Sequence, residues 1–347
     1  IYKTIPIEVN RGCPYLCTFC NSPSTLKIYK DGKQNFFRRK SINILRDEIT
    51  NLVNQWSAEY VYFTSDNFLV WTPREFDEFI EFYSDIRLPF WIQTRPETIK
   101  ETSIKRLKEV GLHRMNIGLE HGNEEFRRKR LLRRMTNEFI LQQSQIVSEV
   151  GIPYTLNNII GLPYETRELF FETVKLNKQI ATFDSLSVNV FVPYHGTPMR
   201  EWAIQEGWLD PDRQTTSVIS ESILEMPPPY LSSKEIMSLQ RVFPLYVSMP
   251  ESRYPEIKRA ETMDAEGDKI FEALSEEFYI AKYGEDEASR KLTFVASKPC
   301  KGCKTMQIVL RNAMNKSRST CSKTMTVPLP WKSRSGSTTR RQASFSP

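Results

Sequence analysis

Short apolar segments alternate with longer amphipathic segments along the first 195 residues, and this alternation limits the fold more than any other feature of the chain. Strands separated by helices are typical of a parallel sheet, because each parallel connection must cross over a face of the sheet. The pattern predicts six β-α units, with strands at 5–9, 60–63, 90–93, 114–119, 154–160 and 185–192. Six units fit either an incomplete (β/α)6 barrel or an open doubly wound sheet, and the pattern does not separate the two.

Local signals place helices between these strands. Thr72 before Pro73 is typical of a helix start, and Gly111 and Gly151 follow helical patterns as stop signals. Helices are predicted at 41–55, from 72 onwards, and at 103–110, 124–132, 137–150 and 165–180. We therefore expect an α/β core over 1–195, followed by a mostly helical extension over 196–297 with helices at 232–242 and 268–283.

The net charge of +6 comes from the end of the chain. From Lys298 onwards there are 11 basic residues and no acidic ones, so the first 297 residues carry a net charge of −5. The segment 298–347 has no apolar period with which to bury surface, and we expect a disordered tail. A nucleic-acid partner would rest on that tail alone, so we do not expect one. No apolar run is long enough to span a membrane, and the cysteine usage suits a cytoplasmic protein.

Cys13, Cys17 and Cys20 form a C-x3-C-x2-C run directly after the first predicted strand. Three thiolates can ligate three irons of a [4Fe–4S] cluster, which leaves the fourth iron open to a substrate or cofactor. Gly12 and Pro14 suit the tight loop that such ligation needs. Zinc sites favour paired C-x2-C units, often with His, and buried free cysteines are the other alternative. The position after a parallel strand places the loop at the carboxyl end of the sheet, where active sites lie in both candidate architectures.

The cysteine run, with Phe19 just before the last cysteine, resembles the signature of the radical S-adenosylmethionine (SAM) enzymes. The resemblance covers residues 5 to about 209 and favours the partial (β/α)6 barrel, TIM-like, with 1–195 as the radical SAM core. It implies a [4Fe–4S] cluster whose open iron binds SAM. It also implies reductive cleavage of SAM to methionine and a 5′-deoxyadenosyl radical.

Further strand ends match the same superfamily. Ser65 and Asp66 follow the second strand, where relatives face the methionyl amine of SAM. Glu120 ends the fourth strand, at the position that bonds the ribose hydroxyls in relatives. The resemblance implies an arginine for the SAM carboxylate downstream, and Arg133 fits best, with Arg134 as a near alternative.

The last two strand ends complete this set. Ile159 and Gly161 stand where the family contacts adenine, and the resemblance places Phe19 and Phe191 among the cofactor-binding residues. The segment 190–199 closely resembles the end of the barrel in cobalamin-associated radical SAM proteins and methylthiotransferases. A single match of this kind is weak evidence, but the ordered set is specific.

We therefore expect a radical SAM enzyme of the branch that usually carries a cobalamin-binding domain. The chain starts at Ile1 in a strand-like run, which fits a piece of a longer protein whose preceding domain would bind cobalamin. Methyl transfer suits this branch, and rearrangement, ring formation and sulfur insertion stay open. The resemblance implies a small-molecule substrate and a flavodoxin or ferredoxin as electron donor. One alternative is a methylthiotransferase acting on RNA or protein, which the helical, acidic region after 210 makes less favoured. Another is a simple iron–sulfur electron carrier, which would need a fourth ligand.

Three further cysteines lie in the basic tail. Cys300 and Cys303 have ligand spacing, with Cys321 further on, and could hold a second cluster or zinc. A fourth ligand is absent from the tail sequence, so free thiols are the favoured interpretation.

Overall fold

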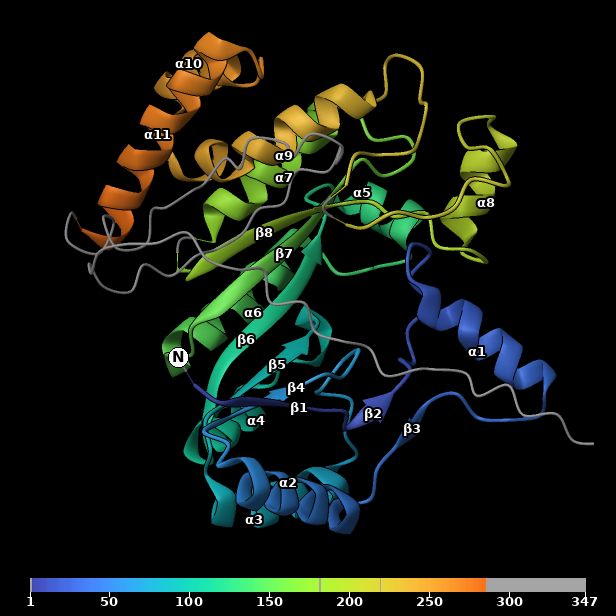
Figure 1. The fold of residues 1–347 in the computed structure, drawn as a ribbon, viewed down its shortest axis with the longest axis vertical. Coiled ribbons are helices and arrows are strands. Elements are labelled where there is room, and N and C mark those ends of the chain that lie inside the picture. The colour runs from blue at the N-terminus through green and yellow to red at the C-terminus, as the bar shows by residue number, and fades with distance from the viewer. Residues whose placement is uncertain (1, 181, 219, 285–347) are drawn as a thin grey trace, which may run out of the picture.

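A computed structural model describes residues 2–180, 182–218 and 220–284, which are built around a six-stranded sheet (Figure 1). The strands of this sheet are β1 (Thr4–Ile7), β4 (Tyr60–Phe63), β5 (Phe90–Thr94), β6 (Leu112–Glu120), β7 (Tyr154–Ile160) and β8 (Ser185–Val190). A two-stranded antiparallel ribbon follows β1 and is made of β2 (Asn10–Arg11) and β3 (Arg38–Arg39).

The six strands are all parallel and pair in chain order, β1-β4-β5-β6-β7-β8. A doubly wound sheet would reverse its direction of strand addition at a switch point. Sequential addition in one direction instead curls the sheet toward a barrel, and β1 and β8 stand at the two ends of the order. The predicted α/β fold with a partial (β/α)6 barrel is therefore confirmed.

Helices cover the outer side of the sheet and enclose a first hydrophobic core. This core packs the early strands against the helices that connect them, and phenylalanines are prominent in it. The helices of this half are α1 (Asn21–Asp31), α2 (Ile42–Trp56), α3 (Pro73–Ile86), α4 (Glu101–Glu109), α5 (Glu124–Phe126), α6 (Asn137–Val150) and α7 (Arg167–Gln179). Short turns of other helix types are η1 (Pro96–Thr98) and η2 (Arg127–Leu131).

The helix ends follow from their sequence signals. At the start of α3, the Thr72 hydroxyl accepts the Glu75 N–H at 3.3 Å, and the Glu75 carboxylate accepts the Thr72 N–H at 3.0 Å. This reciprocal pair is a capping box, which satisfies two of the backbone donors that a helix start leaves unpaired. Helix α6 begins at Thr136, whose hydroxyl accepts the Phe139 N–H at 3.1 Å, and ends at Gly151, whose φ of 77° lies in the left-handed region.

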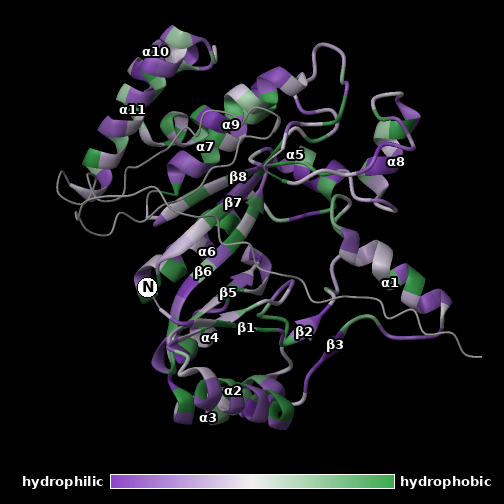
Figure 2. Cartoon of the chain, in the orientation of Figure 1, coloured by the Kyte–Doolittle hydropathy of each residue, from purple (hydrophilic) through white to green (hydrophobic). Residues whose placement is uncertain are grey.

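A helical extension packs on the β7–β8 side of the barrel (Figure 1). Its elements are α8 (Pro198–Gln205), α9 (Ser233–Ser248), η3 (Glu251–Arg253), α10 (Tyr254–Ala260) and α11 (Ala265–Tyr283). A second hydrophobic core joins these helices to α7, and the ribbons of both halves alternate between hydrophobic and hydrophilic segments (Figure 2). The two predicted helices of this region correspond to α9 and α11.

The structure also contains features that the sequence pattern did not predict. The helix expected at 124–132 is α5 followed by the π-helical turn η2, which ends at Leu132 with a left-handed φ of 54°. Helices α1, α8 and α10 and the β2–β3 ribbon were not predicted either. The strand expected at 5–9 is β1, which includes Pro6. The tail 298–347, with Cys300, Cys303 and Cys321, lies outside the described residues.

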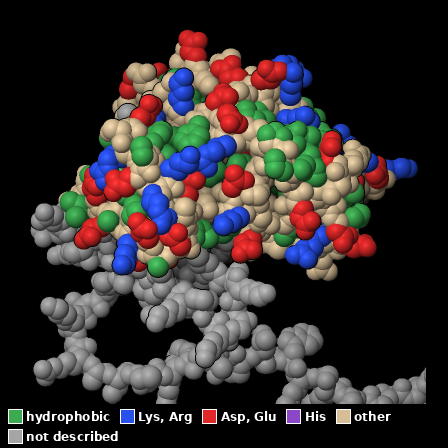
Figure 3. All heavy atoms as spheres, turned by 90° about the horizontal axis from the view of Figure 1, so that it is seen from above, with side chains coloured by type: hydrophobic (Ala, Val, Ile, Leu, Met, Phe, Trp, Pro, Cys, Tyr) green, Lys and Arg blue, Asp and Glu red, His purple; other side chains and the backbone are tan. Residues whose placement is uncertain are grey.

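The surface matches the charge pattern of the folded part. On the face shown in Figure 3, acidic and basic side chains are interspersed, without a broad region of one sign. Within the described residues, no helix combines the length and the apolar character that a membrane span requires.

Gly122 gives a test of how tightly the barrel and α7 are packed. A Cβ at this position would lie 2.2 Å from the backbone carbonyl oxygen of Glu172, and backbone cannot move aside as a flexible side chain can. We expect Gly122→Ala to lower the free energy of unfolding by about 1–3 kcal/mol, as overpacking usually does. Gly32→Ala is the control, because its Cβ would meet nothing closer than 3.6 Å. Equal denaturation midpoints for both variants would contradict this view of the contact.

Candidate functional site

The cysteine loop lies between the β1–β2 segment and α1, at the carboxyl end of β1. Cys13 and Cys17 are buried and Cys20 is half-buried. Cys20 is also the N-cap of α1, where its sulfur accepts the Ser22 N–H at 3.4 Å, and the Ser22 hydroxyl accepts the Cys13 N–H at 3.0 Å. Gly12 has a φ of 87°, and a Cβ there would lie 2.8 Å from the Phe36 ring. The loop is thus held by backbone geometry and by the first turn of α1.

The chemistry of these thiols suits a metal cofactor. Burial raises the pKa of Cys13, and it raises the pKa of Cys20 to about 12. Thiols with raised pKa values stay protonated at neutral pH unless a metal displaces the proton, and thiolate is the form that binds metal. Cys13 and Cys20 would therefore release their protons on binding a metal.

A single metal ion and an iron–sulfur cluster make different demands on their donors. In the part of the chain that the structure describes, no three His, Cys, Asp or Glu side chains converge on a point where one metal ion could sit. A zinc ion needs all its ligands at about 2.0–2.3 Å from one centre. In a [4Fe–4S] cluster each thiolate binds a different iron, so the sulfurs lie further apart. The reason for favouring the cluster over zinc at this loop is the sequence spacing, which lacks a second C-x2-C pair or a His nearby.

Ser65 and Asp66 lie beside the loop, as expected for the end of the neighbouring strand β4. Ser65 is 2% exposed, and its hydroxyl oxygen has no hydrogen-bond partner. Asp66 interacts with the Gly12 N–H and the Ser22 hydroxyl, and burial nevertheless raises the pKa of the Asp66 carboxyl. A buried hydroxyl without a partner is costly, and a bound polar group would satisfy it.

Glu120 and Arg133 meet at the end of β6. Arg133 Nη1 donates to Glu120 Oε1 at 2.8 Å, and Nη2 donates to the Gly118 carbonyl at 2.6 Å. Glu120 has a φ of 71°, and a Cβ on Gly118 would lie 2.4 Å from Glu120 Oε1, so the glycine makes room for the carboxylate. Burial raises the pKa of Glu120, while the positive charges of Arg133 and Arg95 oppose that shift.

The structure separates the two candidate arginines. Arg133 is 2% exposed, and its Nε is buried without a hydrogen-bond partner, so one donor stays free for a ligand. Arg134 is exposed. Arg127 fixes the segment that leads from β6 to the two candidate arginines. Its guanidinium donates to the His121 carbonyl at 2.6 Å and to the Met135 carbonyl at 3.1 Å.

Two residues of the site were missed by the sequence analysis. Arg95 and Glu97 follow β5, the strand end for which no candidate was named. Arg95 Nη1 donates to Cys17 Sγ at 3.0 Å, and its Nη2 donates to Glu97 Oε1 at 2.5 Å. Glu97 Oε2 also lies 3.7 Å from Arg133 Nη2. The available signal was position alone, since Thr94-Arg95 ends a parallel strand on the same edge as the cysteine loop.

An alternating row of charges thus runs through the site, from Arg95 through Glu97 and Arg133 to Glu120. Burial alone would raise the pKa of Glu97, but the hydrogen bond from Arg95 and the charges of both arginines hold it below its usual range. Alternation gives each buried charge a partner of opposite sign, which offsets the cost of removing it from water. The row joins the cysteine loop to the residues predicted to hold SAM.

The remaining predicted residues lie at the β7 and β8 ends. Gly161 has a φ of 80°, donates its N–H to Glu165 at 2.6 Å, and would place a Cβ 2.8 Å from Ile236 of α9. Phe191 is 3% exposed, and Phe19 and Ile159 are partly buried against the second hydrophobic core. Because Gly161 has no Cβ, helix α9 can approach the backbone closely at this position.

Hydrogen bonds between segments that follow the strands connect the two edges of the sheet. The Thr18 hydroxyl in the cysteine loop donates to the Arg130 carbonyl of η2, and the Thr18 carbonyl accepts the Met199 N–H at 3.2 Å. Met199 belongs to α8, after β8. The loop that follows β1 is therefore connected to segments that follow β6 and β8.

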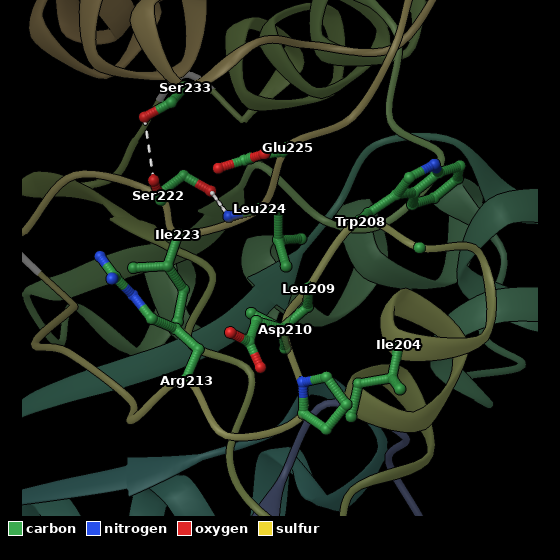
Figure 4. A pocket seen from close by; sticks show the side chains of 12 residues that line it. Ile204, Trp208, Leu209, Asp210, Arg213, Ser222, Ile223, Leu224, Glu225 and Ser233 are labelled. Carbon is green, nitrogen blue, oxygen red and sulfur yellow. Dashed lines mark hydrogen bonds between the residues drawn. The ribbon is translucent and has the colours of Figure 1, made fainter.

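A separate cavity of about 650 Å³ opens between the end of α8 and the segments 207–213 and 222–225 (Figure 4). Apolar side chains such as Leu209 and Ile223 share its lining with Asp210, Arg213 and Glu225. The residues lining it include none of the predicted site residues. The cavity belongs to the extension.

Comparison with known proteins defines the class. Residues 7–176 match the model of the Radical SAM superfamily, a range that contains the cysteine loop and the charged row. The chain therefore contains a radical SAM domain, as the cysteine run and the strand ends predicted.

Individual relatives match over the same part of the chain. An uncharacterised methyltransferase of Pyrococcus horikoshii is 27% identical over 208 residues, or 58% of this chain and 42% of that protein. A tRNA-2-methylthio-N(6)-dimethylallyladenosine synthase of Halalkalibacterium halodurans is 25% identical over 205 residues, or 55% of this chain and 36% of that protein. The chain thus spans about two fifths of the length of these curated relatives.

The fold is also similar to that of OxsB, a cobalamin-dependent SAM radical enzyme whose structure contains aqua-cobalamin and SAM. The TM-score is 0.54 at 13% identity, over 86% of this chain and 48% of that chain. This likeness concerns the fold.

The ligand assignment is tested by replacing Cys13, Cys17 and Cys20 with Ala together. After anaerobic reconstitution we expect about four irons per wild-type chain and almost none in the triple variant, because a cluster needs its thiolates. Iron and sulfide analysis with absorption spectroscopy measures this. A full [4Fe–4S] spectrum in the triple variant would show that other residues are the ligands.

Proposed function

We propose that this chain is the catalytic core of a radical SAM methyltransferase. Cys13, Cys17 and Cys20 would hold the cluster, which when bound supplies the electron that cleaves SAM to methionine and a 5′-deoxyadenosyl radical. The observation that carries the proposal is the arrangement of three thiols, two buried and one half-buried, beside a row of charged side chains that ends in Glu120. The site thus offers a metal-binding loop and a SAM-binding edge side by side.

The chain's own residues would bind and orient SAM. Glu120 accepts hydrogen bonds through a carboxylate, which suits two ribose hydroxyls. Arg133 would present its free Nε–H to the SAM carboxylate, while Glu120 and the Gly118 carbonyl fix its other donors. The unpartnered Ser65 hydroxyl and the Asp66 carboxyl would receive the methionyl amine.

Methyl transfer is favoured by the relative named as a methyltransferase and by the branch that the fold suggests. Cobalamin would be supplied by a domain outside this chain. A flavodoxin or ferredoxin would provide the electron, and the substrate would be a small molecule. The direct test is to incubate reconstituted, reduced protein with SAM and analyse the products by chromatography. A cluster-loaded protein that forms no 5′-deoxyadenosine would contradict the radical chemistry.

A second candidate is methylthio transfer to RNA or protein, favoured by the similarity to the tRNA-modifying synthase. This reaction adds sulfur as well as a methyl group, so it needs a sulfur donor besides SAM. Incubation with SAM and candidate RNA, followed by mass spectrometry of the nucleosides, separates the two. A product heavier by a methylthio group would favour the second candidate.

SAM binding tests the roles of Glu120 and Arg133. A lost hydrogen bond to a charged group costs about 1.5–3 kcal/mol, which is about 10- to 150-fold in affinity. We expect Glu120→Ala and Arg133→Ala to weaken SAM binding by that order while the iron content stays at the wild-type level. Equilibrium binding to the reconstituted protein measures the effect.

The matched control is Arg134→Ala, because this neighbouring arginine is exposed. It should leave the affinity for SAM unchanged. Wild-type affinity in both Glu120→Ala and Arg133→Ala would remove these residues from the site. Thermal unfolding of each variant checks that a weaker affinity does not reflect loss of the fold.

A further inference from the structure

Arg95 is fixed against a cysteine of the metal-binding loop. Its side chain is 9% exposed, and Nη1 donates to Cys17 Sγ at 3.0 Å. Two other donors, Nη2 and Nε, bind the two oxygens of Glu97 at 2.5 and 3.3 Å. The guanidinium also lies 3.7 Å from the centre of the Tyr15 ring. These contacts use both edges and one face of the guanidinium, so Nη1 cannot swing away from the sulfur without breaking them.

A buried guanidinium beside a ligating sulfur has a defined electrostatic effect. Hydrogen bonds to the sulfurs and the local charge are among the factors that set the potential of an iron–sulfur cluster. A cationic donor stabilises the electron-rich reduced state more than the oxidised state. The hydrogen bond is stronger in a buried site than in water, because the local dielectric is low.

We propose that Arg95 raises the reduction potential of the cluster held by Cys17. This inference rests on the proposed function. The redox step is the uptake of one electron from an external donor of the flavodoxin or ferredoxin class, without bond formation. Arg95 keeps its proton throughout, because a guanidinium does not deprotonate in proteins.

Glu97 connects the hydrogen bond between Arg95 and Cys17 to the part of the site where SAM is proposed to bind. Its carboxylate binds Arg95 and also lies 3.7 Å from Arg133 Nη2. The Glu97 carboxylate thus keeps the Arg95 guanidinium in place. It also offsets part of the positive charge of Arg95, so that the donor acts mainly through its short contact with the sulfur.

The experiment is a redox titration of the anaerobically reconstituted protein, followed by electron paramagnetic resonance. Arg95→Met removes the donor and the charge, and we expect the equilibrium constant for reduction to fall at least tenfold, which is about 59 mV for a one-electron couple. Arg95→Lys should shift the potential less, because an ammonium keeps the charge but cannot span Cys17 and both oxygens of Glu97.

Arg106→Met is the matched control, because Arg106 also pairs with an acid, Asp77 at 2.6 Å, and lies over an aromatic ring, that of Phe76 at 5.2 Å. It should leave the potential unchanged. A wild-type potential in a fully iron-loaded Arg95→Met protein would overturn the inference. Loss of iron from both Arg95 variants would also overturn it, because Arg95 would then organise the ligand loop. Wild-type protein without a cluster would instead overturn the proposed function itself.

Discussion

The carboxylate of Glu97 lies between two buried guanidinium groups, and the site depends on this interaction. Removing a charge from water costs several kcal/mol unless an opposite charge and hydrogen bonds replace the solvent. Arg95 follows β5 and Arg133 follows the turn after β6. The Glu97 carboxylate is the acidic partner of Arg95 and a second acidic partner, beside Glu120, for Arg133. The cysteine loop and the predicted SAM edge are therefore parts of one electrostatic unit.

Much of the fold could be predicted because local signals and tertiary packing agree. The strands 60–63 and 154–160 and the helix 137–150 were predicted with their observed bounds, since apolar period, caps and Gly stops coincide there. Helix α1 could not be predicted in this way. Of its residues only Ser22 is buried, so its position follows from the Cys20 cap rather than from an apolar face.

The residues of the candidate site also divide into those that the sequence identified and those that it did not. The cysteines could be identified from their spacing in the sequence, and Glu120 could be identified from its place at the end of a strand. Arg95 and Glu97 could not be identified from the sequence in this way. Arg95 contacts a sulfur 78 residues earlier in the chain, and Glu97 contacts Arg133, which follows η2. Likewise the sequence predicted an ordinary helix over the π-helical turn at 127–131, at whose end the Arg133 N–H donates to the Arg127 carbonyl at 2.9 Å.

An incomplete barrel leaves a free edge, and Pro6 determines what that edge can do. The carbonyls of Lys3 and Ile7 accept hydrogen bonds from Tyr60 and Thr64 on the β4 side, so Pro6 faces the opposite, outer side of β1. A proline offers no N–H to a further strand. The outer side of β1 therefore lacks a donor at its centre, which discourages edge-to-edge aggregation of copies of this chain.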